Sequence, residues 1–185
     1  MEQIRLHGRG GQGVVTAAEL IAIAAFNQGK EAQAFPNFGV ERTGAPIQAF
    51  ARISEKPIIV REQIYNPTVL IIQDATLLNT IDVFAGISKD TKVIINATAN
   101  HRPELKISPR NLYFSPATEI ALEIFGKNIV NTVILGAFAR FTGLISLESL
   151  KKAINIKFAD KGPELIKKNI QAVERAYKLK YENPG

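Results

Sequence analysis

The sequence contains no cysteine among its 185 residues. Iron–sulfur clusters are held by cysteine thiolates, in most cases four per cluster, so this chain cannot hold such a cluster alone. Disulfide bonds are excluded for the same reason. The only two histidines, His7 and His101, lie far apart in the sequence, and we therefore expect no metal site on this chain.

Long apolar runs are lacking as well. A membrane-spanning helix needs roughly 18 consecutive apolar residues or more, whereas the apolar stretch at 132–141 is too short and contains Arg140. Residues 1–5 enter a strand-like pattern directly, without the apolar core or cleavage site of a signal peptide. The sequence therefore predicts a cytoplasmic protein that does not interact with a membrane.

The formal net charge is +6, and the lysines concentrate after Lys151. A basic balance of this kind can indicate nucleic-acid binding. Here, however, acidic residues such as Glu148, Asp160 and Glu164 lie between the lysines, and no DNA- or RNA-binding motif is present. We expect a solvated, lysine-rich helix face and no nucleic-acid partner, with anionic small molecules remaining as candidate ligands.

The length and the 46% content of hydrophobic residues are typical of one globular domain with a proper core. We predict a single domain over residues 1–185, with C-terminal helices at 146–181 as part of it. Ser146 is a candidate N-cap for the first of these helices, and Pro163 marks the start of the second.

Strand and helix patterns alternate along the chain. The apolar run at 69–72 is typical of a strand buried on both faces. The segments 47–53 and 58–60 are predicted to form an antiparallel hairpin, so the sheet is expected to be mixed but mainly parallel. The predicted fold is a three-layer α/β/α domain with a Rossmann-like Gly-rich loop after the first strand. Further strands are expected at 4–6, 31–35, 93–95 and 112–114, and helices at 14–27, 77–84, 117–125 and 131–141.

The loop after the first strand has the pattern G-x-G-x-x-G, formed by Gly8, Gly10 and Gly13. Glycine permits a close backbone approach, and the N-terminus of the following helix offers unpaired N–H groups to an anion. Arg9 could add a charged contact to a phosphate. The alternative is a tight strand-to-helix turn in which the glycines serve packing alone.

A dinucleotide site would also need an acidic residue at the end of the second strand. That strand ends in Ala34-Phe35-Pro36, and Glu31 lies at its start, so the NAD interpretation is weakened. Asp74 and Asn96 follow later strands and are expected along the same sheet edge as the glycine loop. Asp74 could contact a ligand or cap a helix. His7, next to the loop, is expected to be structural.

A second candidate region is the loop at 38–46, which holds a Phe, a Glu–Arg pair and two glycines. Loops of this length usually dock onto another molecule or pack on themselves. Arg42 could clamp a carboxylate or phosphate, or pair with Glu41 or with a carboxylate of another subunit. The residues leave these alternatives open.

Together, the Gly8-Arg9-Gly10-Gly11-Gln12-Gly13-Val14 motif and the later Phe38-Gly39-Val40-Glu41-Arg42-Thr43-Gly44-Ala45-Pro46 motif carry a family resemblance. The chain resembles the gamma subunit of pyruvate:ferredoxin and 2-ketoisovalerate:ferredoxin oxidoreductases. The segment 131–138 and Thr142-Gly143 also match that pattern, so the resemblance covers essentially the whole chain.

The resemblance implies a subunit of an enzyme that converts a 2-oxoacid and coenzyme A to acyl-CoA and CO2 and reduces ferredoxin. It implies partner alpha, beta and delta subunits, and ferredoxin through the complex. Thiamine diphosphate, Mg2+, [4Fe-4S] clusters and CoA would belong to the complex, with no cofactor bound by this chain alone. No nucleophile–base pair or carboxylate dyad is seen, so no catalytic residue is expected here.

The chain is then expected to help assembly and CoA binding. The candidate CoA-binding residues are Gly8, Arg9, Gly10, Gly11, Gln12, Gly13, Arg42 and Thr43. Three alternatives stay open: the equivalent subunit of indolepyruvate oxidoreductase, a stand-alone nucleotide-binding oxidoreductase, and an assembly subunit without a ligand.

Overall fold

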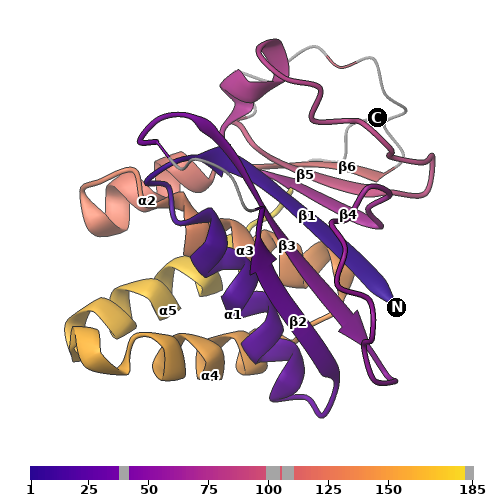
Figure 1. The fold of residues 1–185 in the computed structure, drawn as a ribbon. Helices are drawn as coiled ribbons and strands as arrows, with labels where there is room; N and C mark the ends of the chain where they lie inside the picture. Colours follow the sequence, from indigo (N-terminus) through magenta and orange to yellow (C-terminus); the bar gives the residue numbers. More distant parts are fainter. Residues whose placement is uncertain (38–41, 99–104, 106–110, 182–185) are drawn as a thin grey trace.

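The computed structural model describes residues 1–37, 42–98, 105 and 111–181 (Figure 1). The strands are β1 (Glu2–Arg9), β2 (Glu31–Pro36), β3 (Pro46–Ser54), β4 (Val69–Ile72), β5 (Lys92–Asn96) and β6 (Leu112–Ser115). The helices are α1 (Val14–Phe26), α2 (Ala117–Phe125), α3 (Val130–Thr142), α4 (Leu147–Lys157) and α5 (Pro163–Lys178), with short 3-10 helices η1 (Ala75–Asn79) and η4 (Ala159–Lys161).

The six strands form one sheet in the order β2-β3-β1-β4-β5-β6. β1, β4, β5 and β6 run parallel to one another, whereas β3 is antiparallel to both of its neighbours, β1 and β2. The sheet is therefore mixed and mainly parallel, as predicted. The carboxyl ends of the parallel strands share one edge, where ligands of open α/β sheets bind.

The α-helices lie on one face of the sheet (Figure 1). Because side chains alternate along a strand, Ile4 and Leu6 of β1 face the helices and join a large core with Ala49, Ala51 and Ile71. α1 packs into this core through small residues such as Ala17, Ala18 and Ala24, all fully buried. α4 and α5 contribute to the same core, and the predicted cap Ser146 and first-turn Pro163 occupy those positions.

The opposite face carries a smaller core around Leu70, Ile72, Val93 and Ile95. In the described part of the chain this face is covered by η1 and irregular segments rather than by α-helices (Figure 1). The α/β class is confirmed, but the third layer differs from the helical one that was predicted. Leu77, Ile81 and Phe84 do pack on the sheet here, so their helix-like spacing reflects burial, while only residues 75–79 are helical.

Two buried arginines hold these irregular segments on the sheet. Arg5 of β1 donates to the carbonyl oxygens of Ile64 (3.4 Å), Tyr65 (3.1 Å), Val83 (3.1 Å) and Ala85 (2.6 Å). Arg52 of β3, fully buried, donates to the carbonyl oxygen of Glu62 (2.5 Å) and to Gln33 Oε1 (3.1 Å). The two arginine side chains thus supply hydrogen bonds to backbone carbonyl groups that have no partner in the β-sheet.

The predicted strand at 58–60 is wrong. β3 already pairs along one edge with β2 and along the other with β1, so no edge is left for a hairpin partner. The Ile58-Ile59-Val60 run instead lies in an irregular segment, and it forms no strand despite its strand-like composition.

Candidate functional site

The two motifs that carry the family resemblance meet at the carboxyl end of β1. The N–H of Gly10 donates to the carbonyl oxygen of Ala45 (2.9 Å), and the N–H of Gly44 donates to the carbonyl oxygen of Gly10 (3.0 Å). Gly10 also forms an isolated parallel bridge with Thr43. The Gly8–Gly13 loop and residues 42–45 are thus one structural unit. Phe38, Gly39, Val40 and Glu41 lie outside the described residues, as does the predicted Glu41–Arg42 pair.

Glycine is required at two positions of this unit. A Cβ atom on Gly10 would collide with the backbone carbonyl of Arg42, so only glycine lets the two segments approach. Gly13 has φ 67° and ψ 34°, and a Cβ atom there would overlap the side-chain amide of Asn131. Close packing therefore requires glycine at Gly10 and at Gly13.

The Arg9 side chain is bound by three other residues of this chain. Its Nε forms an ion pair with Asp74 Oδ2 (3.2 Å), Nη1 donates to the Gly44 carbonyl (3.0 Å) and Nη2 donates to Thr76 Oγ1 (2.7 Å). The Arg9 side chain keeps 27% of its surface exposed. Arg9 therefore ties β1, the 42–45 segment and η1 together, and its positive charge is partly neutralised by Asp74.

Asp74 is the acceptor at the centre of this network. Its Oδ2 also accepts from Gln12 Nε2 (2.9 Å), and its Oδ1 accepts from the Thr76 N–H (3.0 Å) and the Thr76 hydroxyl (2.5 Å). Gln12 Oε1 in turn accepts a hydrogen bond from the backbone N–H of Arg9 (2.8 Å). Burial by itself would raise the pKa of the Asp74 carboxyl, but the hydrogen bonds from Thr76 and Gln12, together with the Arg9 charge, leave that pKa lowered. Asp74 is thus a helix cap, one of the two roles that the sequence left open, and it also anchors the loop.

Two helix N-termini come together beside the loop. Gly13, the N-cap of α1, touches Asn131 in the first turn of α3. Neither helix has a side-chain cap or an acidic residue in its first turn. The unpaired N–H groups and aligned dipoles at such ends favour an anion. A Cβ atom on Gly11, which has φ 91°, would meet nothing within 4 Å, so the loop is open on this side.

Gln73, a polar residue buried along the same edge, was not singled out from the sequence. Gln73 is 1% exposed, and neither atom of its side-chain amide has a hydrogen-bond partner among the described residues. Its Oε1 lies 3.4 Å from where a Gly8 Cβ atom would stand. Asn96 lies on this edge, as predicted: it donates to the Gln73 carbonyl (2.9 Å) and accepts the Thr118 N–H at the start of α2 (3.1 Å). The only sequence signal for Gln73 is its place directly after the buried run of β4.

His7 is fully buried on β1, beside Ile72 of β4. Burial, and then the positive charge of Arg5, lowers the pKa of His7 to about 3, so the imidazole is neutral. Strand alternation places it on the face with Arg5, away from the helices and from the helix N-termini. Neither ring nitrogen of His7 has a hydrogen-bond partner among the described residues, so the histidine is buried but not satisfied by hydrogen bonds. Arg42 and Thr43 are both exposed next to the loop.

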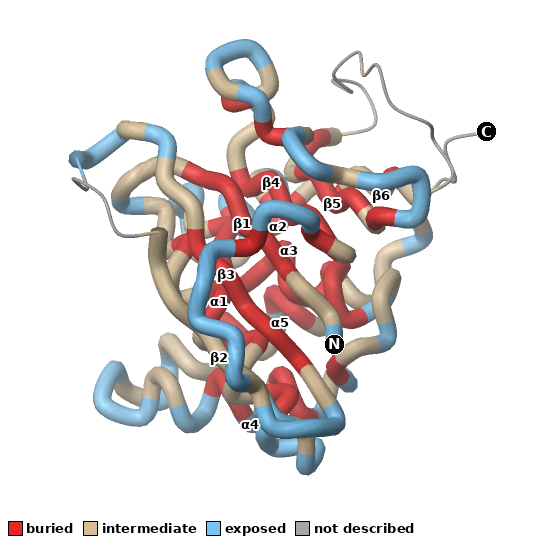
Figure 2. Tube along the Cα trace, turned by 45° about the vertical axis from the view of Figure 1, so that its right-hand side comes forward, coloured by how far each residue is buried: buried red, intermediate tan, exposed pale blue. Residues whose placement is uncertain are grey.

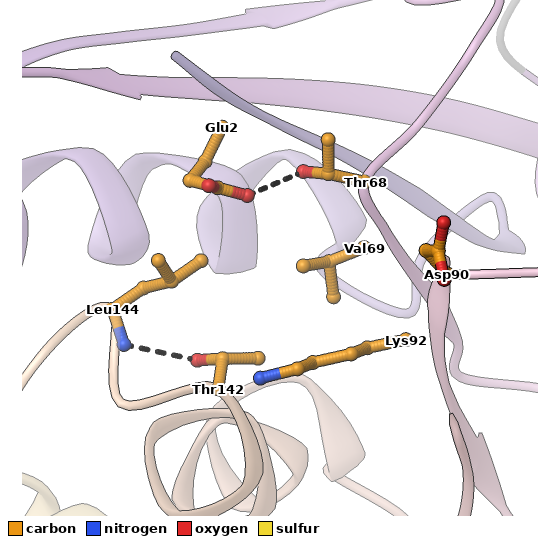
Figure 3. Close-up of a pocket in the computed structure, with 7 residues that line it drawn as sticks. All are labelled: Glu2, Thr68, Val69, Asp90, Lys92, Thr142 and Leu144. Carbon is orange, nitrogen blue, oxygen red and sulfur yellow. Dashed lines mark hydrogen bonds between the residues drawn. The ribbon is translucent and has the colours of Figure 1, made fainter. Parts of the chain in front are cut away.

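A separate hollow of about 370 Å3 opens at the other end of the sheet (Figure 3). It is lined by Glu2, Thr68, Val69, Asp90, Lys92, Thr142 and Leu144, which lie around the amino ends of β1, β4 and β5. Lys92 Nζ donates to the carbonyl oxygen of Phe141 at the end of α3 (3.1 Å), so its ammonium is already engaged. This hollow does not include the glycine loop and offers two carboxylates, which makes it a poor site for an anion.

Among the described residues no three His, Asp or Glu side chains lie close enough together to hold a metal ion. None of the described helices is long and apolar enough to cross a bilayer.

Comparison with known proteins shows which family the chain belongs to. Residues 3–179 match the family described as pyruvate ferredoxin/flavodoxin oxidoreductase. The chain belongs to this family. It is 54% identical to pyruvate synthase subunit PorC of Methanosarcina barkeri, over 83% of this chain and 85% of that protein. It is 50% identical to the pyruvate/ketoisovalerate oxidoreductases common subunit gamma of Pyrococcus abyssi, over 96% of each.

Solved structures share the fold. The pyruvate oxidoreductase subunit PORC of Thermotoga maritima matches with a TM-score of 0.79 and 36% identity, over 96% of this chain and 95% of that one. A 2-oxoglutarate:ferredoxin oxidoreductase from Magnetococcus marinus, 23% identical, also has a TM-score of 0.79. That match covers 99% of this chain but 32% of the other, so the same fold occurs there as one part of a longer polypeptide.

Proposed function

We propose that this chain is the gamma subunit of a pyruvate/2-ketoisovalerate:ferredoxin oxidoreductase. The observation that carries the proposal is the similarity to named gamma and PorC subunits over nearly their full length. The complex would convert a 2-oxoacid, CoA and oxidised ferredoxin to acyl-CoA, CO2 and reduced ferredoxin, in the cytoplasm. Its alpha, beta and delta subunits would carry thiamine diphosphate with Mg2+ and the [4Fe-4S] clusters.

The chain would act as a single domain and a non-catalytic subunit. It has no cysteine to ligate a cluster, and Arg9 and Asp74 of the glycine-loop site are paired with each other. The isolated chain is expected to be inactive. Co-purification with a thiamine-binding chain and a ferredoxin-like chain would support the assignment, whereas turnover of a 2-oxoacid by the isolated chain would refute it. Co-purification with indolepyruvate oxidoreductase subunits would favour that alternative.

We further propose that the exposed side of the Gly8–Gly13 loop faces the phosphates of CoA. The support is the pair of helix N-termini at Gly13 and Asn131, the open space at Gly11 and the partly exposed side chain of Arg9. Because Arg9 is already paired with Asp74, backbone N–H groups would supply the main contacts. One helix N-terminus contributes about 1 kcal/mol to holding a charge, so other subunits must contribute to CoA affinity.

A matched pair of substitutions at Gly11 tests this contact. Asparagine and aspartate tolerate a positive φ similarly and have the same size, but only Gly11→Asp places a negative charge at the open side of the loop. A unit charge about 4 Å from another in water changes the energy by ~1 kcal/mol, so Gly11→Asp should raise the KM for CoA about fivefold above Gly11→Asn. The measurement is steady-state kinetics of the assembled complex, with the KM for the 2-oxoacid as the internal control.

Equal CoA KM values for Gly11→Asp and Gly11→Asn in fully assembled complexes would refute the CoA contact. That result would leave the assignment as a gamma subunit intact and favour a purely assembling role.

A further inference from the structure

The first turn of α3 is buried, yet its backbone N–H groups have no partner. All residues from Val130 to Ala139 are buried, and α3 runs through the centre of the molecule (Figure 2). In the described part of the chain, the N–H groups of residues 130–132 donate no hydrogen bond, and no side chain caps this end. Most buried N–H groups in folded proteins are paired, and a buried helix end without partners is unusual. This end is therefore suited to receive acceptor atoms from another molecule.

The N-terminus of α1 adds a second set of free donors at the same place. The N–H groups of residues 14–16 donate no hydrogen bond to any described residue, and the N-cap Gly13 supplies no side chain. Asn131, in the first turn of α3, contacts Gly13, so the two helix ends adjoin. Each end carries about half a positive elementary charge, so the two ends together attract an anion more strongly than one end would.

The side chain between the two helix ends is an amide without a partner. Asn131 is 8% exposed, and its amide forms no hydrogen bond with the residues that the structure describes. Its amide nitrogen is the atom nearest to the position of a Gly13 Cβ atom, so the side chain reaches the start of α1. The neighbouring Thr132 hydroxyl is fully buried and also lacks a described partner. Because a buried polar group without a partner costs free energy, these side chains indicate a ligand at the junction of α1 and α3.

The charges around this junction do not oppose an anion. Neither first turn carries a carboxylate, and Asp74 of the glycine-loop site is paired with Arg9. Lys127, in the turn that leads into α3, is exposed and forms no ion pair with a described residue. On α2, Glu123 pairs with an arginine of α5, and the exposed Glu119 lies at the opposite end of α2 from that turn. The junction therefore has a positive balance.

The arrangement of the donors favours a phosphate monoester. Such a group presents three terminal oxygens and carries a charge of about −1.5 to −2 at pH 7. Each phosphorus of a diphosphate bridge presents two terminal oxygens and one charge. The junction offers three groups of donors, namely the first-turn N–H groups of α1, those of α3, and the amide of Asn131. CoA carries one phosphate monoester, the 3′-phosphate of its ribose.

We propose that Asn131 binds the 3′-phosphate of CoA, together with the first-turn N–H groups of α1 and α3. The inference rests on the proposed CoA contact of the glycine loop and deepens it, because it names the phosphate and the side chain that recognises it. The diphosphate of CoA is the competing source of the same phosphate chemistry.

Two substitutions at Asn131 separate binding from packing. Asn131→Leu removes the amide at similar size, whereas Asn131→Asp keeps the shape and places a negative charge at two helix N-termini. A negative charge there favours folding, so a purely structural role predicts that Asn131→Asp is stable and binds CoA normally. If Asn131 binds the phosphate, both variants should raise the KM for CoA of the assembled complex about tenfold, which corresponds to the loss of a hydrogen bond to a charged group.

Dephospho-CoA, which lacks only the 3′-phosphate, identifies the phosphate. With this substrate the wild type and both variants should have equal KM values, and its inhibition constant against CoA replaces the KM if it is not turned over. Asn155→Asp is the control, because this exposed residue of α4 undergoes the same change of charge away from the helix N-termini and should leave both KM values unchanged. Thermal unfolding of the isolated variants checks that they fold.

An unchanged KM for CoA in both Asn131 variants would overturn the inference. An equal rise with CoA and with dephospho-CoA would also overturn it, because the residue would then hold the diphosphate or act through packing. Failure of the CoA contact itself is recognised separately, by equal CoA KM values for Gly11→Asp and Gly11→Asn. An assembled complex without CoA-dependent turnover of a 2-oxoacid would instead refute the proposed function.

Discussion

Replacing Asp74 by asparagine tests whether one carboxylate holds the glycine loop in place. Asp74 Oδ2 accepts from Arg9 Nε (3.2 Å) and Gln12 Nε2 (2.9 Å), and these two donors belong to the loop. In Asp74→Asn, one oxygen can still accept from the Thr76 N–H and cap η1. The amide nitrogen then faces two donors, so both contacts to the loop are lost.

The expected cost follows from the exposure of the partners. The Arg9 and Asp74 side chains are 27% and 16% exposed, so the ion pair itself contributes about 0.5–1 kcal/mol. The hydrogen bond from Gln12 to a charged, half-buried acceptor adds about 1–1.5 kcal/mol. We therefore expect Asp74→Asn to lower the free energy of unfolding by about 2 kcal/mol at pH 7, which is about 4–8 °C in Tm for a chain of this length.

The pH dependence has a definite sign. Because the folded-state pKa of Asp74 is lowered from 3.8, the carboxylate contributes stability that is fully present above the unfolded-state pKa. That contribution is lost as the pH falls through the folded-state pKa. The difference between wild type and Asp74→Asn should therefore be constant from pH 7 to about pH 5 and shrink below it.

Urea unfolding of the isolated chain at a series of pH values measures this difference. Asp90→Asn is the control, because Asp90 is exposed and its carboxylate accepts no hydrogen bond among the described residues. The reasoning fails if both variants lose equal stability at pH 7, or if the Asp74→Asn difference does not change between pH 7 and pH 3.

Two further predictions concern the irregular layer on the second sheet face. Gly86 has φ 72°, and a Cβ atom there would collide with the Tyr65 carbonyl, whereas Gly126, with φ 66°, has open space around it. Gly86→Ala should therefore lower the free energy of unfolding, measured with a chemical denaturant, by about 3 kcal/mol, and Gly126→Ala should lower it by about 1 kcal/mol. Equal losses in the two variants would contradict the close approach of Gly86 to the Tyr65 carbonyl. Arg5→Met leaves four carbonyl oxygens without their donor and should cost about 3 kcal/mol or more. Arg175→Met removes an arginine that is half exposed and pairs with Glu123, so it should change stability by less than about 1 kcal/mol; a similar loss in both variants would contradict the role of Arg5.

Features that depend on neighbouring residues could be predicted from the sequence. The glycine spacing at 8–13 indicated a strand, a tight loop and a helix, and the structure has β1 and α1 there. The apolar run of β4, the cap at Ser146 and the first-turn Pro163 were likewise predicted, because burial on both faces, capping and proline geometry are local properties. The prediction that Asp74 and Asn96 share the edge with the glycine loop followed from the common direction of parallel strands.

Other features depended on which segments meet in space. β3 lies between β2 and β1, so it has no free edge with which the apolar run at 58–60 could form a hairpin, although the composition of that run is that of a strand. The partner of Arg9 is 65 residues away, and Asn131 reaches Gly13 from α3 across more than half of the chain. Short-range patterns carry no information on such long-range pairs, because sheet order and helix docking are chosen by the burial of the whole core. The sequence by itself determined the elements and the position of the loop; the tertiary structure decided which side chains hold that loop and which helix ends lie beside it.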